Sequence, residues 1–282
     1  MNAPLAASVA PAWRAHLDLE FAPRGARTRL TACSHRGPLL VQRAFNPETD
    51  GVCHAYLVHP PAGIVGGDEL ELAARVRTGA AALLTTPSAT RFYRSAGATA
   101  RLAQRFEVAP GASLEWLPQE NLLIEGARAA IRTEVALRGD ARFCGWEMVC
   151  LGRPACAEGF ARGTLDQRIT LSRDDRPLLC ERLRPAEGRA LAASGAGLRG
   201  HAALATLFAT GADAGTLVTA RAGLAAFADG LLASATLLDD LLVCRLLASH
   251  IAPLRGACER LWAALRPALL GRDAHAPRIW AT

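Results

Sequence analysis

Acidic residues within or beside strongly apolar segments are the side chains in this sequence best suited to chemistry. Asp68 follows the glycine-rich turn GIVGG, and Glu147 interrupts the apolar run GWEMVC. Glu158 follows the turn at Gly152, and Glu181 lies in LLCERLR. Burying a carboxylate is costly unless it is paired, hydrated or bound to a metal ion. For each acid taken singly, the simplest interpretation is an ion pair with an arginine such as Arg153, Arg162 or Arg182.

Several of these acids facing one hydrated interior would have a different meaning. Carboxylate oxygens bind late divalent transition metals less tightly than imidazole or thiolate does, so a passage lined by them could release its cargo. Among the softer ligands, His35 and His59 are the best single candidates, each at a predicted strand end. Cys53 and His54 are neighbours on a predicted strand and point to opposite faces, so they do not easily chelate one ion.

The eight cysteines give no metal or redox motif, because the sequence contains no CxxC pair. Cys144, Cys150 and Cys156 are spaced by six, which on a strand would place the first two on one face. Gly152 and Pro154 interrupt the pattern before the third. Since small buried cysteines are common, packing in the core is favoured over metal binding.

The absence of lysine excludes two classes of enzyme. All 32 basic residues are arginine, and the net charge is +6. A P-loop NTPase needs its Walker A lysine, and a pyridoxal-phosphate enzyme needs a lysine Schiff base. The segment GAGLRG at 195–200 fits GxGxxG, but it lacks the preceding apolar strand and is predicted to be a turn. The arginines are dispersed and stacking aromatics are few, so a nucleic-acid-binding role is disfavoured.

The elements that must position these residues are mostly short strands. Alternating apolar runs recur about every thirty residues, and Gly79-Ala80, Gly111-Ala112 and Gly139-Asp140 each open a new run. This repeat favours stacked turns of sheet, as in a β-solenoid or an elongated sandwich, over a closed barrel. Residues 217–232 have apolar residues at helical spacing, 235–249 fits either a strand pair or a helix, and a helix is expected to begin near Pro253.

The expected organisation is therefore a flexible tail over residues 1–15 and one β-rich domain over 16–282. The domain is mainly β, an elongated β-helix-like stack of short strands with a small C-terminal helical part. No secretory signal is recognisable at the N-terminus, and Asp239-Asp240 interrupts the longest apolar run. We expect a cytoplasmic protein with reduced thiols and no membrane span.

Three long segments resemble the signature segments of the UreD family of urease accessory proteins, called UreH in some organisms. They are HPPAGIVGGDEL, LLTTPSATRFYRS and GASLEWLPQENLL, and the similarity continues through GWEMVCLGR. The resemblance covers nearly the whole chain, in order and without large gaps. It implies a β-helix-like stack with about two helices, acting as a non-catalytic scaffold. Its implied partners are UreF, through UreF the nickel-binding GTPase UreG, and the apo-urease subunits.

The resemblance also implies a role for particular residues. A polar internal path would carry Ni²⁺ transiently, with no tightly bound cofactor, and the residues that match motif positions are Asp68, Thr85, Thr86, Glu147 and Glu181. From the residues themselves, Arg91, Tyr93 and Arg94 are candidates for a partner interface, since exposed Arg and Tyr often anchor one. A surface strand with one satisfied ion pair is an equal alternative for these three.

The competing functional hypothesis is an enzyme. A β-solenoid hydrolase acting on carbohydrate would use paired carboxylates, with Glu147 and Glu181 as its acid and base. Such an enzyme needs aromatic platforms for sugars, and five scattered tryptophans do not supply them. The sequence therefore favours a maturation scaffold over a hydrolase.

Overall fold

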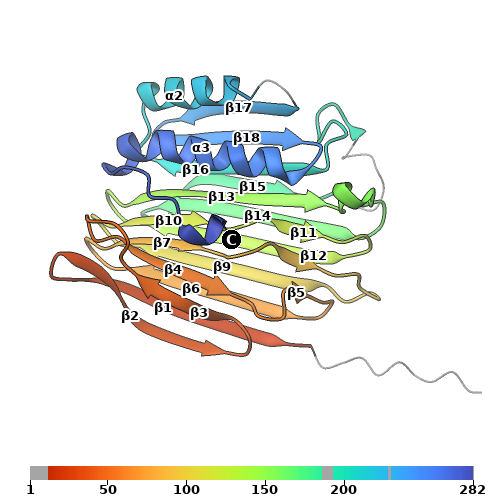
Figure 1. Cartoon of the computed structure of the whole chain (residues 1–282), viewed down its shortest axis with the longest axis horizontal. Helices are drawn as coiled ribbons and strands as arrows, with labels where there is room; N and C mark the ends of the chain where they lie inside the picture. The colour runs from red at the N-terminus through yellow and green to blue at the C-terminus, as the bar shows by residue number, and fades with distance from the viewer. Residues whose placement is uncertain (1–11, 186–192, 228–229, 282) are drawn as a thin grey trace, which may run out of the picture.

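The computed structural model describes residues 12–185, 193–227 and 230–281 of the chain. Two β-sheets lie face to face, and two α-helices cover the outer side of one of them (Figure 1). Most of the expected N-terminal tail, residues 1–11, lies outside the described residues. The first strand begins at Arg14, inside the segment that was expected to be tail.

Sheet A has seven strands, and its central five are parallel to one another. In spatial order its strands are β15 (Arg176–Leu183), β14 (Thr164–Arg173), β12 (Arg128–Leu137), β9 (Ala100–Val108), β6 (Glu69–Val76), β1 (Arg14–Arg24) and β2 (Arg27–Arg36). The edge strands β2 and β15 each pair antiparallel with their neighbour and carry mostly exposed or half-buried side chains.

Sheet B has eleven strands, eight of them in one continuous order. These are β17 (Leu231–Leu238), β18 (Leu241–Ala248), β16 (Ala203–Thr210), β13 (Arg142–Leu151), β10 (Ser113–Leu117), β7 (Ala81–Thr85), β4 (Cys53–Val58) and β3 (Leu40–Phe45). The other three form a short parallel ladder beside the end of β13: β5 (Gly63–Ile64), β8 (Thr90–Phe92) and β11 (Asn121–Leu123).

The chain alternates between the two sheets, which makes it a β-solenoid-like stack, as the repeat predicts. Gly79, Gly111 and Gly139 lie at the crossings from sheet A to sheet B, and all three have positive φ. A glycine adopts this left-handed backbone without steric cost. A Cβ built on Gly111 would lie 3.8 Å from the backbone N of Gly79, so the turns stack directly on one another.

The space between the sheets is the main hydrophobic core. Side chains alternate along each strand, so every second residue points inward. Leu17, Leu72, Ile131 and Leu165 from sheet A meet residues such as Leu84 and Leu114 from sheet B. A few polar side chains interrupt this apolar interior, and they form the candidate site described below.

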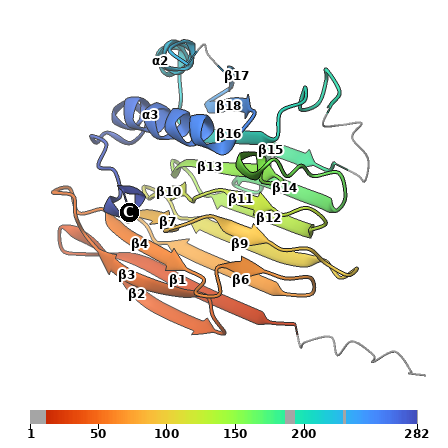
Figure 2. The same cartoon turned by 45° about the vertical axis from the view of Figure 1, so that its right-hand side comes forward.

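The two helices pack on the outer face of sheet B (Figure 2). Helix α2 (Ala214–Ala225) begins with a capping box in which the Asp213 carboxylate accepts from the Thr216 N–H. Helix α3 (Ile251–Leu270) buries the apolar face predicted for the closing helix, including Leu254, Leu261 and Trp262. Two short 3-10 helices, η1 (Pro154–Cys156) and η2 (Arg278–Ala281), complete the described elements.

The C-terminal region resolves the ambiguous prediction for residues 235–249. It forms the antiparallel hairpin β17–β18, whose turn is Asp239-Asp240 with Asp239 at positive φ. The helical spacing seen over 217–232 holds only in part, because α2 ends at Ala225 and β17 begins at Leu231. Pro253 lies in the first turn of α3, and Gly271 ends that helix at positive φ.

Candidate functional site

A buried polar cluster lies between the two sheets around Glu147. One carboxylate oxygen of this residue accepts hydrogen bonds from Thr133 Oγ1 at 2.7 Å, Trp116 Nε1 at 3.1 Å and Gln104 Nε2 at 3.3 Å. The amide of Asn121 lies 3.5 Å from the other oxygen. We call these five residues the Glu147 cluster.

Strand register explains why these residues meet. Gln104 on β9 is paired with Thr133 on β12, so the two polar side chains are neighbours on the inner face of sheet A. They donate across the core to Glu147 on β13, while Trp116 on β10 and Asn121 on β11 approach from sheet B. Every partner is a donor, as a buried carboxyl oxygen requires.

Burial raises the pKa of Glu147 above the ordinary 4.5 of a glutamate, and the bonds from Thr133, Trp116 and Gln104 only partly oppose this effect. Removing a carboxyl from water disfavours its charged form. The protonated acid is therefore favoured over a wider pH range than in the unfolded chain. A divalent cation that binds here must compete with that proton.

This pKa shift predicts a pH-dependent stability. Because the folded pKa is the higher one, the contribution of Glu147 is complete below pH 4.5 and is lost as the pH rises through the folded pKa. We expect the free energy of unfolding of Glu147→Gln, relative to that of the wild type, to increase as the pH rises from 4.5 through the folded pKa. Urea denaturation across this range measures the difference, and a constant difference would refute the shift.

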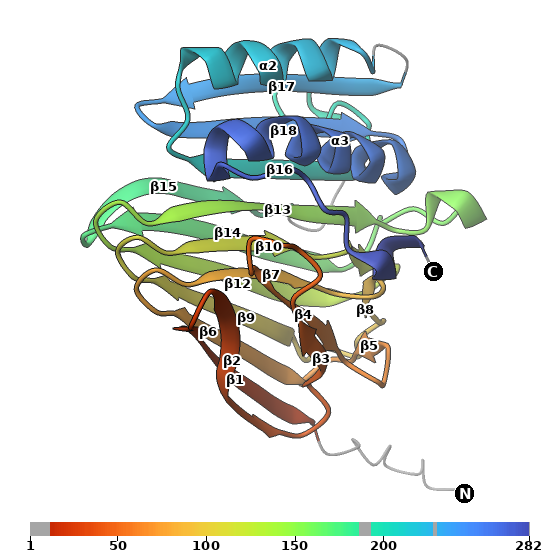
Figure 3. The same cartoon turned by 60° about the vertical axis from the view of Figure 1, so that its left-hand side comes forward.

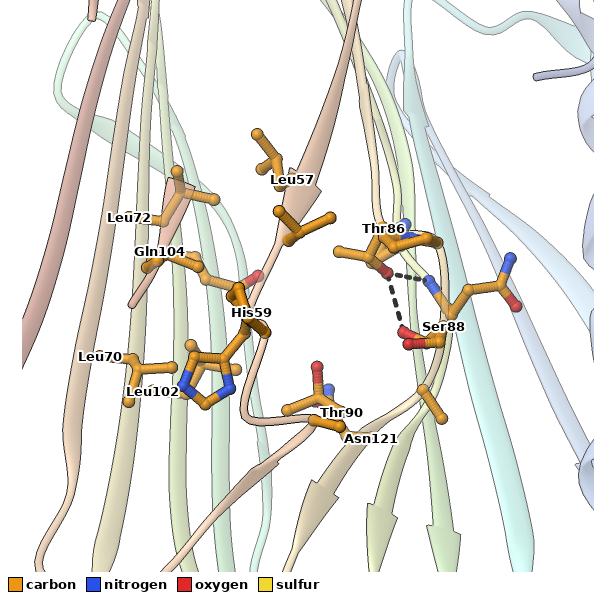
Figure 4. Close-up of a pocket in the computed structure, with 18 of the residues that line it drawn as sticks. Leu57, His59, Leu70, Leu72, Thr86, Ser88, Thr90, Leu102, Gln104 and Asn121 are labelled. Carbon is orange, nitrogen blue, oxygen red and sulfur yellow. Dashed lines mark hydrogen bonds between the residues drawn. The ribbon is translucent and has the colours of Figure 1, made fainter. Parts of the chain in front are cut away.

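A cavity of about 250 Å³ leads to the Glu147 cluster. Gln104, Trp116 and Asn121 line the cavity and also donate to Glu147, so the Glu147 carboxyl lies directly behind the inner wall of the cavity. Figure 4 shows polar side chains from the loops facing leucines from the two sheets. The polar lining residues are His59, Thr86, Ser88, Thr90, Gln104, Gln119 and Asn121.

His59 supplies an imidazole to this cavity. Burial lowers its pKa, although Asp68 opposes the effect, so the neutral ring is favoured. Its Nε2 is buried and has no hydrogen-bond partner among the described residues. A neutral imidazole nitrogen is a good ligand for a late divalent transition metal. The single-ligand candidate His59 thus lies in the cavity, whereas His35 lies on the exposed edge strand β2.

The five predicted path residues do not share one lining. Thr86 lines the cavity, where its hydroxyl accepts from the Gln119 N–H at 2.9 Å, and Glu147 lies behind the inner wall. Thr85 points to the outer side of sheet B, donating to the Leu117 carbonyl at 2.6 Å and accepting from Trp280 Nε1 at 2.9 Å. The last two residues, Asp68 and Glu181, are not among the residues that line this cavity.

Asp68 holds the glycine-rich turn together. Its two carboxylate oxygens accept from the backbone N–H groups of Trp13 at 2.8 Å and Val65 at 2.9 Å. The side chain is buried, and both bonds fix the path of the chain around the turn. The geometry gives Asp68 a structural role in the turn, from which its charge also acts on His59 in the cavity.

Glu181 lies at the opposite edge of the core. It pairs with Arg245 Nε at 2.6 Å, joining the inner side of β15 to that of β18. The pair lines a separate cavity with Gln167 and Leu198. Glu147 and Glu181 therefore do not face each other across a shared cleft, as an acid and base pair of a glycosidase must. Glu158 forms an ion pair with Arg153, which is the simplest interpretation of this acid from the sequence.

Sequence reasoning missed a second buried polar cluster, which lies under helix α3. The Arg266 guanidinium makes two hydrogen bonds to Glu115 at 2.8 and 2.9 Å and two to Glu48 at 2.7 and 2.8 Å. Trp262 Nε1 also donates to Glu115 at 2.6 Å, and His54 Nε2 lies 2.6 Å from Glu48. Burial would raise the pKa of Glu48, but the bonds from His54 and Arg266 lower it to about 2. The available signal was Glu115 within the apolar run SLEWL.

The three candidate interface residues lie together at one end of the stack. Arg91 on β8 is exposed, and Tyr93 and Arg94 follow that strand on the surface. The Tyr93 ring rests on Gly63, where a Cβ would come within 2.1 Å of it. Neither Arg91 nor Arg94 makes an ion pair with a described residue.

The cysteines show no arrangement for binding a metal ion. Cys144 and Cys150 are buried in the apolar layer between sheet B and the helices, and Cys156 is exposed in η1. Burial raises the pKa of Cys150 to about 11, so this thiol stays protonated. Among the described residues, no group of three or more His, Cys, Asp or Glu side chains is placed to hold an ion.

Comparison with known proteins assigns this architecture to a family. A family model described as UreD urease accessory protein matches residues 14–281. The chain belongs to the UreD family. It is 49% identical over 270 residues to the urease accessory protein UreD of Pseudomonas putida (strain GB-1). This alignment covers 96% of this chain and 95% of that protein.

Two other UreD proteins are similar to this chain in identity and coverage. The one from Azoarcus sp. (strain BH72) is 49% identical over 274 residues, covering 96% of this chain and 95% of its own length. The one from Alkalilimnicola ehrlichii is 44% identical over 280 residues, covering 99% and 95% respectively. The relatives are named as accessory proteins, which implies a non-catalytic role for the family. Within the described residues, no helix is both long and apolar enough to cross a membrane.

Proposed function

We propose that this UreD-family chain is a cytoplasmic scaffold for urease maturation that also passes Ni²⁺ through its interior. It would bind UreF and, through UreF, the GTPase UreG, and this assembly would dock on apo-urease. The metal ion is cargo in this scheme, so no resident cofactor is required. Family membership supports the accessory role.

The observation that supports the passage is the cavity that ends at the Glu147 cluster. Its lining combines one neutral imidazole with several hydroxyl and amide oxygens, and the Glu147 carboxyl lies directly behind the lining residues Gln104, Trp116 and Asn121. Oxygen ligands of this kind hold Ni²⁺ less tightly than a set of thiolates would. The cavity can therefore bind the ion briefly and release it.

The path we propose differs in extent from the set expected from the family resemblance. Thr86 and His59 line it, and Glu147 lies behind its inner wall, bonded to Gln104 and Trp116. Thr85 and Asp68 would act by positioning the strands and the turn beside the cavity. Glu181 would belong to the path only if a route connects its cavity to the Glu147 cluster through the core.

Co-expression tests the proposed function. Apo-urease is produced with UreF, UreG and either the wild-type chain or no chain, and nickel per urease active site is measured after purification. We expect the wild-type chain to co-purify with its partners and to raise the nickel content of urease. Equal nickel content with and without the chain would contradict the proposal.

A further inference from the structure

Large apolar side chains are exposed around the glycine-rich turn at one end of the stack. Trp13, Val65 and Tyr93 expose 49%, 48% and 41% of their surface. Figure 3 shows β5 and β8, the paired strands that precede Val65 and Tyr93, next to each other along one side of the stack. We call these three residues the turn patch. Scattered exposed apolar residues need no explanation, whereas a group of them around one turn is typical of an interaction site.

A single turn, residues 63–68, holds the patch together. Asp68 accepts from the backbone N–H of both Trp13 and Val65, which brings these two residues to the same carboxylate. On the other side, the Tyr93 ring lies directly over Gly63, and the Tyr93 N–H donates to the Ile64 carbonyl at 2.9 Å. The turn that contains Val65 thus contacts both aromatic residues. Binding to this preformed surface would lose little conformational entropy.

The side of the patch next to Tyr93 is positively charged. Arg91 and Arg94 are exposed, and neither pairs with a described acid. Glu158 lies close enough to Arg94 to feel its charge, but its carboxylate is already paired with Arg153. Aromatic residues beside arginine are the composition enriched at binding hot spots. A partner surface with carboxylates around an apolar centre would complement this arrangement.

We propose that the turn patch, with Arg91 and Arg94, is a docking site for a protein of the maturation assembly that presents an apolar group flanked by carboxylates. The inference rests on the proposed function. Pro60 and Ala62 precede the turn and line the cavity, as do Ala89 and Thr90 immediately before Arg91. A protein bound at the patch would therefore lie beside the cavity, where cargo could pass between the two.

A protein fits this surface better than the other polyanions or a membrane. Two aromatic rings beside a single turn do not make a row for stacking successive bases, and Glu125 and Glu158 lie nearby among the arginines. Membrane anchoring by such side chains usually involves an amphipathic helix with a broad apolar face. The described part of this region contains only strands, turns and the three-residue η1.

Binding measurements on full-length variants test the proposal. Immobilised apo-urease and immobilised UreF–UreG complex are each titrated with the wild-type chain, with the double variant W13A/V65A and with Val218→Ala. Val218 serves as the control because it is 67% exposed on α2, which lies far from β5 in the structure (Figure 1). We expect W13A/V65A to weaken binding to one of the two probes by about tenfold and V218A to leave both unchanged. Thermal melting of each variant confirms that it is folded.

Charge reversal provides the second arm. R91E/R94E should weaken binding to the same probe and reduce its dependence on salt, because rim charges act through screened electrostatics. If W13A/V65A and R91E/R94E bind both probes as the wild type does, the turn patch is not a docking site, while the proposed function stands. If the wild type binds neither probe and does not raise urease nickel, the proposed function fails and the docking site fails with it. Loss of binding to anionic phosphatidylserine vesicles alone would also overturn the protein assignment.

Discussion

Replacing Arg266 with methionine is expected to lower the free energy of unfolding by about 3–5 kcal/mol, because it leaves two buried carboxylates without their cation. Arg266 is fully buried, and Glu115 and Glu48 are 1% and 6% exposed at their side chains. Its bonds tie helix α3 to β10 and to the loop after β3. Losing them would weaken the attachment of the helix, which its apolar face alone would then hold to sheet B. Urea denaturation followed by circular dichroism measures the loss.

Two matched variants isolate the cause of this loss. The Arg138–Asp175 pair is similarly short at 2.7 Å but exposed, so Arg138→Met should change stability little. The triple variant R266M/E115Q/E48Q also removes the two buried carboxylate charges that R266M leaves unpaired, so it should recover a large part of the lost stability. If R266M is as stable as R138M, the buried cluster does not hold the helix in place.

Replacing Glu147 with glutamine is expected to lower the nickel content of co-expressed urease by about tenfold, the usual scale for loss of an important group at a metal site. The amide keeps nearly the same volume but cannot become a carboxylate ligand. The variant should still co-purify with its partners, because the residue is buried between the sheets and touches no surface. Nickel per active site is measured by elemental analysis of purified urease.

The matched control for this prediction is Glu181→Gln. Glu181 is also an acid on the inner side of a strand, but it pairs with Arg245 at the other edge of the core. If E147Q and E181Q lower the nickel content equally, the path runs through both cavities. Unchanged nickel content in E147Q would exclude Glu147 from the path.

The architecture was predictable because its signals are local. Strand alternation and the glycines at 79, 111 and 139 can each be recognised within a few residues of sequence. In the structure these glycines have positive φ and define the stacked turns. Glu147 was identifiable for the same reason, as an acid within an apolar run. The ambiguity over 235–249 arose because short apolar runs fit both periods, and only pairing with β16 settles the matter.

The partners of the buried acids were not predictable, because register between distant strands decides them. Glu115 and Arg266 are 151 residues apart, and nothing near either one indicates the other. Gln104 and Thr133 look like ordinary strand residues until the parallel register places them side by side beneath Glu147. Asp68 illustrates the same limit at a turn: only the structure shows that its carboxylate accepts the N–H groups of Trp13 and Val65.

The central claim is that nickel passes through the cavity, and obstructing the cavity tests it most directly. Thr90 lines the cavity at the start of β8, so Thr90→Trp should fill the space with an indole, whereas Thr90→Val keeps its shape. Nickel per urease active site is measured after co-expression with each variant, in complexes shown to assemble normally. We expect metal-poor urease with T90W and wild-type nickel content with T90V. Full nickel content with an assembled T90W complex would contradict passage through the cavity.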